Sequence, residues 1–309
     1  LFEATVDIYQ QVRHNVLANR TVIPEAMGLG LQPLDNIGKV RSRGLDFAGK
    51  IQHAFNSDLW VILNGTFTYS KATYREIEEA ADKPEWQWKK GHDISQQVGY
   101  IAEGLFRDQM EIDNSPVQGG DLMPGDIRYK DLNNDGVIDI NDQTNLGSKK
   151  AKGYYGVTAG FNYKGFDFSV FVQGTLNRQI YLSGDFMHGS GNSGNNAITS
   201  YVLGRWTPEN HTNTQTRIWY GNNNNNKVTS SFWLYNADYF RLKNVEVGYT
   251  FPTAWTRKVG IPSVRIFANG MNLLTVSEIF DVRDDIDPEV WGSNYPLTRT
   301  INFGISIKL

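Results

Sequence analysis

The sequence predicts an all-β protein, and three observations favour a transmembrane antiparallel β-barrel within that class. Apolar and polar residues alternate with a period of two in segments of roughly ten to fifteen residues. Short and long connections between these segments alternate along the chain, which is typical of outer-membrane barrels. Aromatic residues gather where segments meet their short turns, as in the aromatic girdles at membrane interfaces.

Eight strands are expected, and the first begins within a few residues of Leu1. Farther along, Leu59, Val61 and Leu63 alternate with polar neighbours, and a hairpin over 157–172 repeats the pattern. At the C-terminus every second residue of 301–309 is apolar. We place the strands near 3–17, 40–55, 59–73, 153–164, 166–178, 238–251, 263–275 and 299–309.

The connections at the two ends of this predicted sheet differ in length. Short turns join 55 to 59 and 163 to 166, and a link bounded by Pro252 and Pro262 joins two more strands. The other connections are long, and they cover 18–39, 74–152, 179–237 and 276–298. Compact soluble domains seldom contain structureless loops beyond about 15 residues, so we expect these loops to be extracellular. A membrane strand over Ile94–Phe106 would break the alternation, so we assign that segment to an extracellular loop as well.

On pattern alone, a soluble β-sandwich stays open as the alternative, because its core also places aromatic residues on one face of each strand. The composition excludes other classes. The chain has 309 residues, a net charge of −3 and no cysteine. No apolar run approaches the roughly 20 residues of a membrane helix, and the near-neutral charge gives no reason to expect nucleic acid as a partner. Without cysteine there are no disulfides and no zinc-thiolate sites in this chain.

One segment has the spacing of a calcium-binding loop, in which oxygen ligands recur at fixed positions around a glycine. Gly136 is that glycine, and an aspartate replaces the usual glutamate at the last position. The alternative is a metal-free turn whose side chains cap their own backbone. The candidate ligands of a structural Ca²⁺ are Asp131, Asn133, Asp135, Val137 through its carbonyl, Asp139 and Asp142.

Nothing in the sequence points to catalysis. The five histidines are scattered, and the carboxylates of 284–289 are expected to serve as turns or caps. The asparagine run 222–226 reads as a mobile polar loop tip. Loop aromatics could stack on sugar rings or contact a partner. These candidate substrate-binding residues are Trp86, Trp88, Trp219, Tyr220 and Trp291.

Several segments together resemble the C-terminal portion of SusC/RagA-type TonB-dependent outer-membrane transporters. Each segment is moderately specific, and six of them in the family's order are strongly so. They are Val98–Tyr100 with Gly104–Phe106, Pro124–Asp139, Arg205–Glu209, Asp238–Pro252, Arg265–Thr275 and Tyr295–Arg299. One departure is the final residue, since such barrels usually end in an aromatic residue and this chain ends in Leu309.

The resemblance implies about the last eight strands of a barrel of about 22, with the plug domain and first strands outside this chain. It implies import of a glycan or peptide across the outer membrane of a Gram-negative bacterium, by a multi-pass barrel. A SusD-like lipoprotein would act as the lid, and TonB would supply energy. We expect the wet interior to be lined by Asn64, Thr66, Asn162, Asp167, Gln173, Asn302 and Ser306. The runner-up function is a secreted, calcium-stabilised β-sandwich that binds or hydrolyses carbohydrate.

Overall fold

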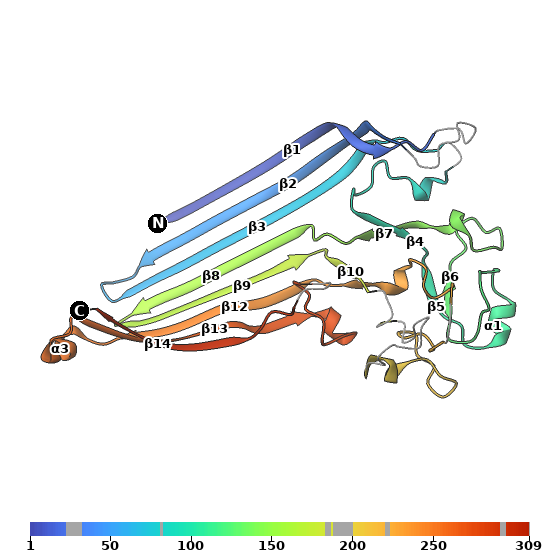
Figure 1. Cartoon of the computed structure of the whole chain (residues 1–309). Coiled ribbons are helices and arrows are strands. Elements are labelled where there is room, and N and C mark those ends of the chain that lie inside the picture. The colour runs from blue at the N-terminus through green and yellow to red at the C-terminus, as the bar shows by residue number, and fades with distance from the viewer. Residues whose placement is uncertain are drawn as a thin grey trace.

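The eight expected strands form one antiparallel sheet in the computed structural model (Figure 1). The structure describes residues 1–22, 33–80, 83–182, 187, 200–219, 223–290 and 295–308. Each strand pairs with the next, in the order β1 (Phe2–Asn19), β2 (Leu34–Ala54), β3 (Leu59–Glu76), β8 (Gly153–Tyr163), β9 (Phe166–Leu176), β12 (Tyr239–Thr250), β13 (Ser263–Ser277) and β14 (Thr300–Lys308). The all-β prediction is confirmed. No second sheet of comparable size covers this one within the described ranges, so the structure does not support a sandwich.

Short turns lie at one end of the sheet and long connections at the other (Figure 1). Between β8 and β9 the turn consists of Lys164 and Gly165, whose φ angles are 49° and 85°. Positive φ at both central residues matches the twist of a two-residue hairpin. The β12–β13 link contains α3 (Thr253–Thr256) and η6 (Arg257–Val259), and η6 is capped by Gly260 with φ 77°. The predicted arrangement, with short turns at one end of the sheet and long connections at the other, is therefore present.

The long connections are more ordered than expected. They contain η2 (Glu85–Gln87), β4 (Gln96–Gly99), β5 (Ala102–Leu105), α1 (Gln109–Asp113), β6 (Ile127–Tyr129), η3 (Ile140–Asp142), β7 (Thr144–Ser148), β10 (Gln179–Tyr181), η4 (Ser200–Gly204), η5 (Ser231–Trp233), β11 (Leu234–Asn236) and η7 (Glu278–Asp281). Among the described residues, two-stranded sheets pair β4 with β7, β5 with β6, and β10 with β11. The segment Ile94–Phe106 lies outside the large sheet, as predicted. Strands of three to five residues are too short to leave a periodic signal in sequence.

These connections share one hydrophobic core, and their described residues are termed the loop subdomain. Trp233, Ile127 and Ile279 come from three different connections, and each is fully buried. The core residues are Leu105, Ile127, Tyr129, Ile180, Leu182, Met187, Trp206, Trp233, Ala237, Ile279 and Ile286. The loops therefore pack on one another and do not project singly.

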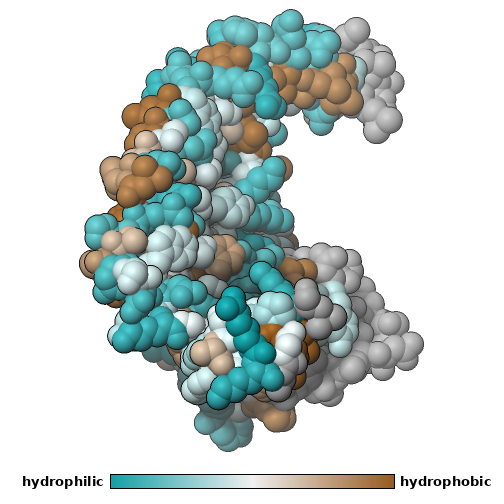
Figure 2. All heavy atoms as spheres, turned by 90° about the vertical axis from the view of Figure 1, so that its left-hand side faces the viewer, coloured by the Kyte–Doolittle hydropathy of each residue, from teal (hydrophilic) through white to brown (hydrophobic). Residues whose placement is uncertain are grey.

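The large sheet has one apolar and one polar face, because opposed residues in antiparallel strands point the same way. On the apolar face Phe168 pairs with Val247, which pairs with Ala268, which pairs with Phe303. Many of these side chains stay exposed, such as Ile8 at 80% and Phe303 at 82%. Viewed from the short-turn end, the sheet is an arc hollowed on one side, with hydrophobic residues along its convex left-hand edge (Figure 2).

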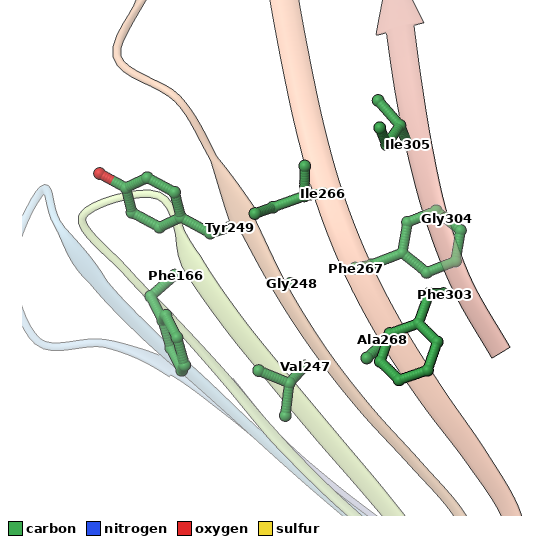
Figure 3. A pocket seen from close by; sticks show the side chains of 10 residues that line it. All are labelled: Phe166, Val247, Gly248, Tyr249, Ile266, Phe267, Ala268, Phe303, Gly304 and Ile305. Carbon is green, nitrogen blue, oxygen red and sulfur yellow. The ribbon is translucent and has the colours of Figure 1, made fainter. Parts of the chain in front are cut away.

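A groove of about 610 Å³ lies on this apolar face across β9, β12, β13 and β14 (Figure 3). Phe166, Tyr249 and Ile266 form one row of its lining, and the small side chain of Ala268 leaves room beside Phe303.

None of the described helices has the length and apolar character needed to cross a membrane. Many large apolar side chains of this face are exposed, and soluble monomers rarely expose large apolar patches.

Candidate functional site

The polar face of the sheet carries the side chains that the sequence assigns to a wet interior. Register places all of them opposite the apolar face, since Asp167 pairs with Gly248 while Phe168 pairs with Val247. The same alternation holds on the other strands for Asn64, Thr66, Asn162, Gln173, Asn302 and Ser306. The structure therefore confirms that they share one face.

An ion-paired cluster fixes charge on this polar face. Arg265 of β13 donates through Nε to Asp167 Oδ1 of β9 at 3.0 Å and through Nη2 to Glu246 Oε1 of β12 at 2.7 Å. Nearby, Asn302 Nδ2 donates to Asn269 Oδ1 at 2.9 Å. Because all these groups have partners, the wall is polar without being strongly of one sign.

A second cluster fastens the 281–290 loop to the polar face. Arg241 of β12, whose side chain is 3% exposed, donates to Asp287 Oδ1 at 2.8 Å and to Glu289 Oε2 at 2.7 Å. Lys243 and Gln173 each donate to Glu289 Oε1 at 3.0 Å. The expected turn or cap role describes these carboxylates only in part. The side-chain partners of Asp287 and Glu289 lie on β12 and β9, far away in sequence.

The pKa of Asp287 reflects this arrangement. Burial of the carboxyl acts to raise its pKa, and the Arg241 guanidinium and the backbone N–H of Glu289 act in the opposite direction. The hydrogen bonds and the charge outweigh burial, so the pKa lies below its ordinary value. The loop contact is therefore made by the ionised carboxylate.

Three asparagines expected in a mobile loop tip, Asn223, Asn225 and Asn226, are buried instead, so that prediction is wrong for them, while Asn224 is exposed. Asn226 is fully buried, and its Nδ2 donates to Asp126 Oδ1 at 2.8 Å while its Oδ1 accepts from the N–H of Ile127. Asn223 also donates to Asp126, and so does Arg217 at 3.0 Å. Asparagine amides satisfy the buried carboxylate and backbone of another connection, which composition alone does not reveal.

In the calcium-like segment, each aspartate carboxylate accepts from nearby N–H groups. Asp131 accepts from Asn134 and Gly136 at 2.6 and 2.8 Å, and Asp135 accepts from Val137 at 2.9 Å. Asp142 is fully buried and accepts from Leu132 and from Asp139. No cluster of three or more histidines or acidic residues arranged to hold a metal occurs in the described ranges. This geometry is that of the metal-free alternative, and calcium binding through Asn133, Val137 and the aspartates stays a prediction.

The candidate aromatic residues occupy different environments. Trp86 donates through Nε1 to Asn141 O at 2.8 Å, which ties η2 to the calcium-like segment. Trp88 is 39% exposed and lies near β1–β3. Trp219 is only 5% exposed, so its expected position on an open loop surface is wrong. Tyr220 and Trp291 lie outside the described residues, as does Leu309.

Sequence reasoning missed a pocket in the loop subdomain. It has a volume of about 310 Å³ and combines the rings of Phe232 and Tyr235 with amide and hydroxyl groups of the same connection and a carboxyl group of the connection after β13. The polar residues are Asn213, Thr214, Gln215 and Asp281. Rings beside a few polar groups are typical of ligand pockets. Only the Phe232–Tyr235 segment, with two rings three residues apart, could have indicated it.

Comparison with known proteins gives one consistent answer. No family model matches the chain. Over 99% of its length the chain is 25% identical to TonB-dependent receptor P3 of Formosa agariphila, of which it covers 32%. It is 22% identical to TonB-dependent receptor SusC of Bacteroides thetaiotaomicron, over 94% of this chain and 29% of that protein.

Solved structures agree on the fold. The RagAB peptide importer in its open-open state matches with a TM-score of 0.71 and 18% identity, over the whole of this chain and 33% of that one. The chain thus spans about a third of the relatives that it matches. The predicted resemblance to SusC/RagA-type TonB-dependent transporters is confirmed, and the sheet is similar to part of such a barrel.

Proposed function

From this resemblance to SusC/RagA-type transporters, we propose that the chain forms the C-terminal part of an outer-membrane barrel that imports a nutrient. The observation that carries the proposal is the two-faced sheet, whose eight strands place apolar residues on one side and polar residues on the other. The apolar face would contact lipid, and the polar face would line the interior. The matched proteins are named as receptors and as a transporter, which supports transport without catalysis.

The edges of the sheet support assembly into a larger barrel. In the described sheet β1 and β14 are the outermost strands, so each has one edge without a strand partner. An unsatisfied backbone group in lipid costs several kcal/mol, which makes an open edge untenable in a membrane. Further strands would then close the barrel.

The loop subdomain would form the extracellular vestibule. It lies at the end of the sheet opposite the short turns, which in outer-membrane barrels face the periplasm (Figure 1). We propose that Phe232 and Tyr235 contact the substrate in the pocket of the loop subdomain. The loop subdomain would also contact a SusD-like lipoprotein that acts as a lid. Import would depend on energy delivered through TonB. Glycan is the favoured substrate class, because rings beside neutral amides suit sugar faces and hydroxyls, and peptide is the alternative.

The test is uptake by cells that carry or lack the gene. Labelled oligosaccharides and labelled peptides are offered separately, with and without an uncoupler that dissipates the proton gradient. The proposal expects gene-dependent uptake of one class, its loss with the uncoupler, and a large reduction by Phe232→Ala. Gly119→Ala, at an exposed position with open space around a new Cβ, is the matched control. Uptake of both classes without the gene would refute the proposal.

A further inference from the structure

The apolar face of the sheet changes character at the loop end of β1, β2 and β3. Ile8, Leu45 and Tyr69 form a cross-strand row on that face. Two residues farther along each strand, the next row on the same face is Gln10, Arg43 and Lys71, and Arg41 lies in the row after it. Charged residues therefore replace apolar ones on the surface that would otherwise contact lipid.

Gln10, Arg41 and Arg43 line an open groove of about 770 Å³, in which positive charge dominates. Its lining contains five basic side chains and one acidic side chain, together with the exposed ring of Trp88. The charged residues are Lys39, Arg41, Arg43, Arg75, Lys90 and Glu76. Collecting like charges is unfavourable unless an anion offsets their repulsion.

Internal partners satisfy only part of this charge. Lys39 Nζ pairs with Glu76 Oε1 at 3.0 Å, and Arg43 Nε donates to Gln10 Oε1 at 2.7 Å. The Nε of Arg41 is buried from solvent and has no hydrogen-bond partner among the described residues. A buried donor of a charged group without a partner is costly, so the site is incomplete without an acceptor.

Height along the barrel indicates where that acceptor lies. From Phe55 at the short-turn end to Leu45, β2 and its turn span ten residues, or about 33 Å of strand. At the roughly 45° tilt of membrane strands this is about 23 Å of height, close to the apolar band of about 25 Å in such barrels. Arg43 and Arg41 thus lie just beyond the hydrocarbon layer, at the level of the headgroups. Trp88 lies at the same level, where interfacial rings gather.

We propose that this basic groove binds the phosphate groups of a phosphorylated lipid in the outer leaflet. The inference rests on the membrane placement in the proposed function. The acyl chains of the bound lipid would follow the apolar rows below, which begin at Ile8, Leu45 and Tyr69. A soluble anionic glycan is disfavoured because the groove opens on the apolar face, away from the polar face and its substrate path.

Lipid binding to the complete protein tests the proposal. The protein is purified in neutral detergent, and native mass spectrometry compares bis-phosphorylated lipid A with the same lipid after removal of its phosphates. The expected result is preferential binding of the phosphorylated lipid, and a loss of about tenfold in the variant Arg41→Gln with Arg43→Gln. Lys50→Gln is the matched control, because Lys50 lies on the same strand but on the polar face.

Three outcomes would overturn the proposal: equal binding of the two lipids, unchanged binding by the double variant, or displacement of the phosphorylated lipid by a soluble sulfated oligosaccharide. If the double variant does not fold, the comparison of the two lipids on the unmodified protein decides. The assay involves no transport, so its result is independent of the uptake experiment. Phosphate preference without gene-dependent uptake would support the lipid site and refute the transport proposal.

Discussion

The large sheet and the loop subdomain differ in where they place their apolar side chains. The sheet leaves Ile8 and Phe303 exposed along one face, whereas the loop subdomain buries Trp233 and Ile127 completely. Burial from water stabilises the loop subdomain, and no such burial stabilises the outer side chains of the sheet. Under the proposed membrane placement, lipid would meet the apolar face of the sheet and water would surround the loops.

The largest expected effect removes the centre of the loop core. Trp233→Ala should destabilise the loop subdomain by about 3–5 kcal/mol, because it deletes a fully buried ring and leaves a cavity. Hydrogen exchange of the 94–148 segment is the measurement. The matched control is Phe303→Ala, which removes an exposed ring and should leave loop exchange unchanged. Equal effects of the two substitutions on loop exchange would contradict the statement that buried apolar side chains stabilise only the loop subdomain.

The next effect concerns the buried asparagines. Asn226→Ala should cost about 1–3 kcal/mol, because Asp126 and the N–H of Ile127 each lose a buried hydrogen bond. Asn224→Ala is the comparison at the neighbouring asparagine, which is more exposed. Protease cleavage rates of the loops report the loss. Wild-type resistance in Asn226→Ala would mean that this network does not order the loop subdomain.

The contact between the two regions should depend on pH. The pKa of Asp287 lies below its ordinary value in the folded protein. Its ion pair with Arg241 therefore stabilises the fold at pH values above the unfolded carboxyl pKa of about 3.9. This stabilisation is lost as the pH falls through the lower pKa of the folded state. In 281–290, the protection of amides relative to their intrinsic exchange rate at each pH should therefore be high at neutral pH and be lost only in acid below about pH 4. Arg241→Gln should give fast exchange already at pH 7. A loop that loosens between pH 8 and 6 would contradict this account.

Calcium is expected to have the smallest effect. If the 131–142 segment binds Ca²⁺, calorimetry at millimolar metal should show heat that Asp131→Ala with Asp135→Ala abolishes. Asp121→Ala, on an exposed aspartate outside the segment, is the control. No heat with the unmodified protein would assign these carboxylates to the backbone caps that the structure shows.

Sequence periodicity predicts the sheet well and the loop subdomain poorly, for a physical reason. A strand such as β14 is apolar on one face throughout, so alternation identifies both the strand and its apolar face. In the loops, contacts join residues far apart in sequence, such as Asn226 with Asp126 or Arg241 with Glu289. No local pattern encodes these pairs. Trp219 shows the same limit, since a tryptophan in a predicted loop looks exposed until tertiary packing buries it.

The central claim is that one face of the sheet meets lipid and the other meets water, and neighbouring residues of β14 test it directly. The chain contains no cysteine, so Asn302→Cys and Phe303→Cys each introduce one thiol into it, on opposite faces. Labelling is measured in native outer membranes with a charged, water-soluble maleimide. The account predicts rapid labelling of the Asn302→Cys variant and protection of the Phe303→Cys variant until detergent is added. Equal labelling of both, or the reverse order, would contradict it.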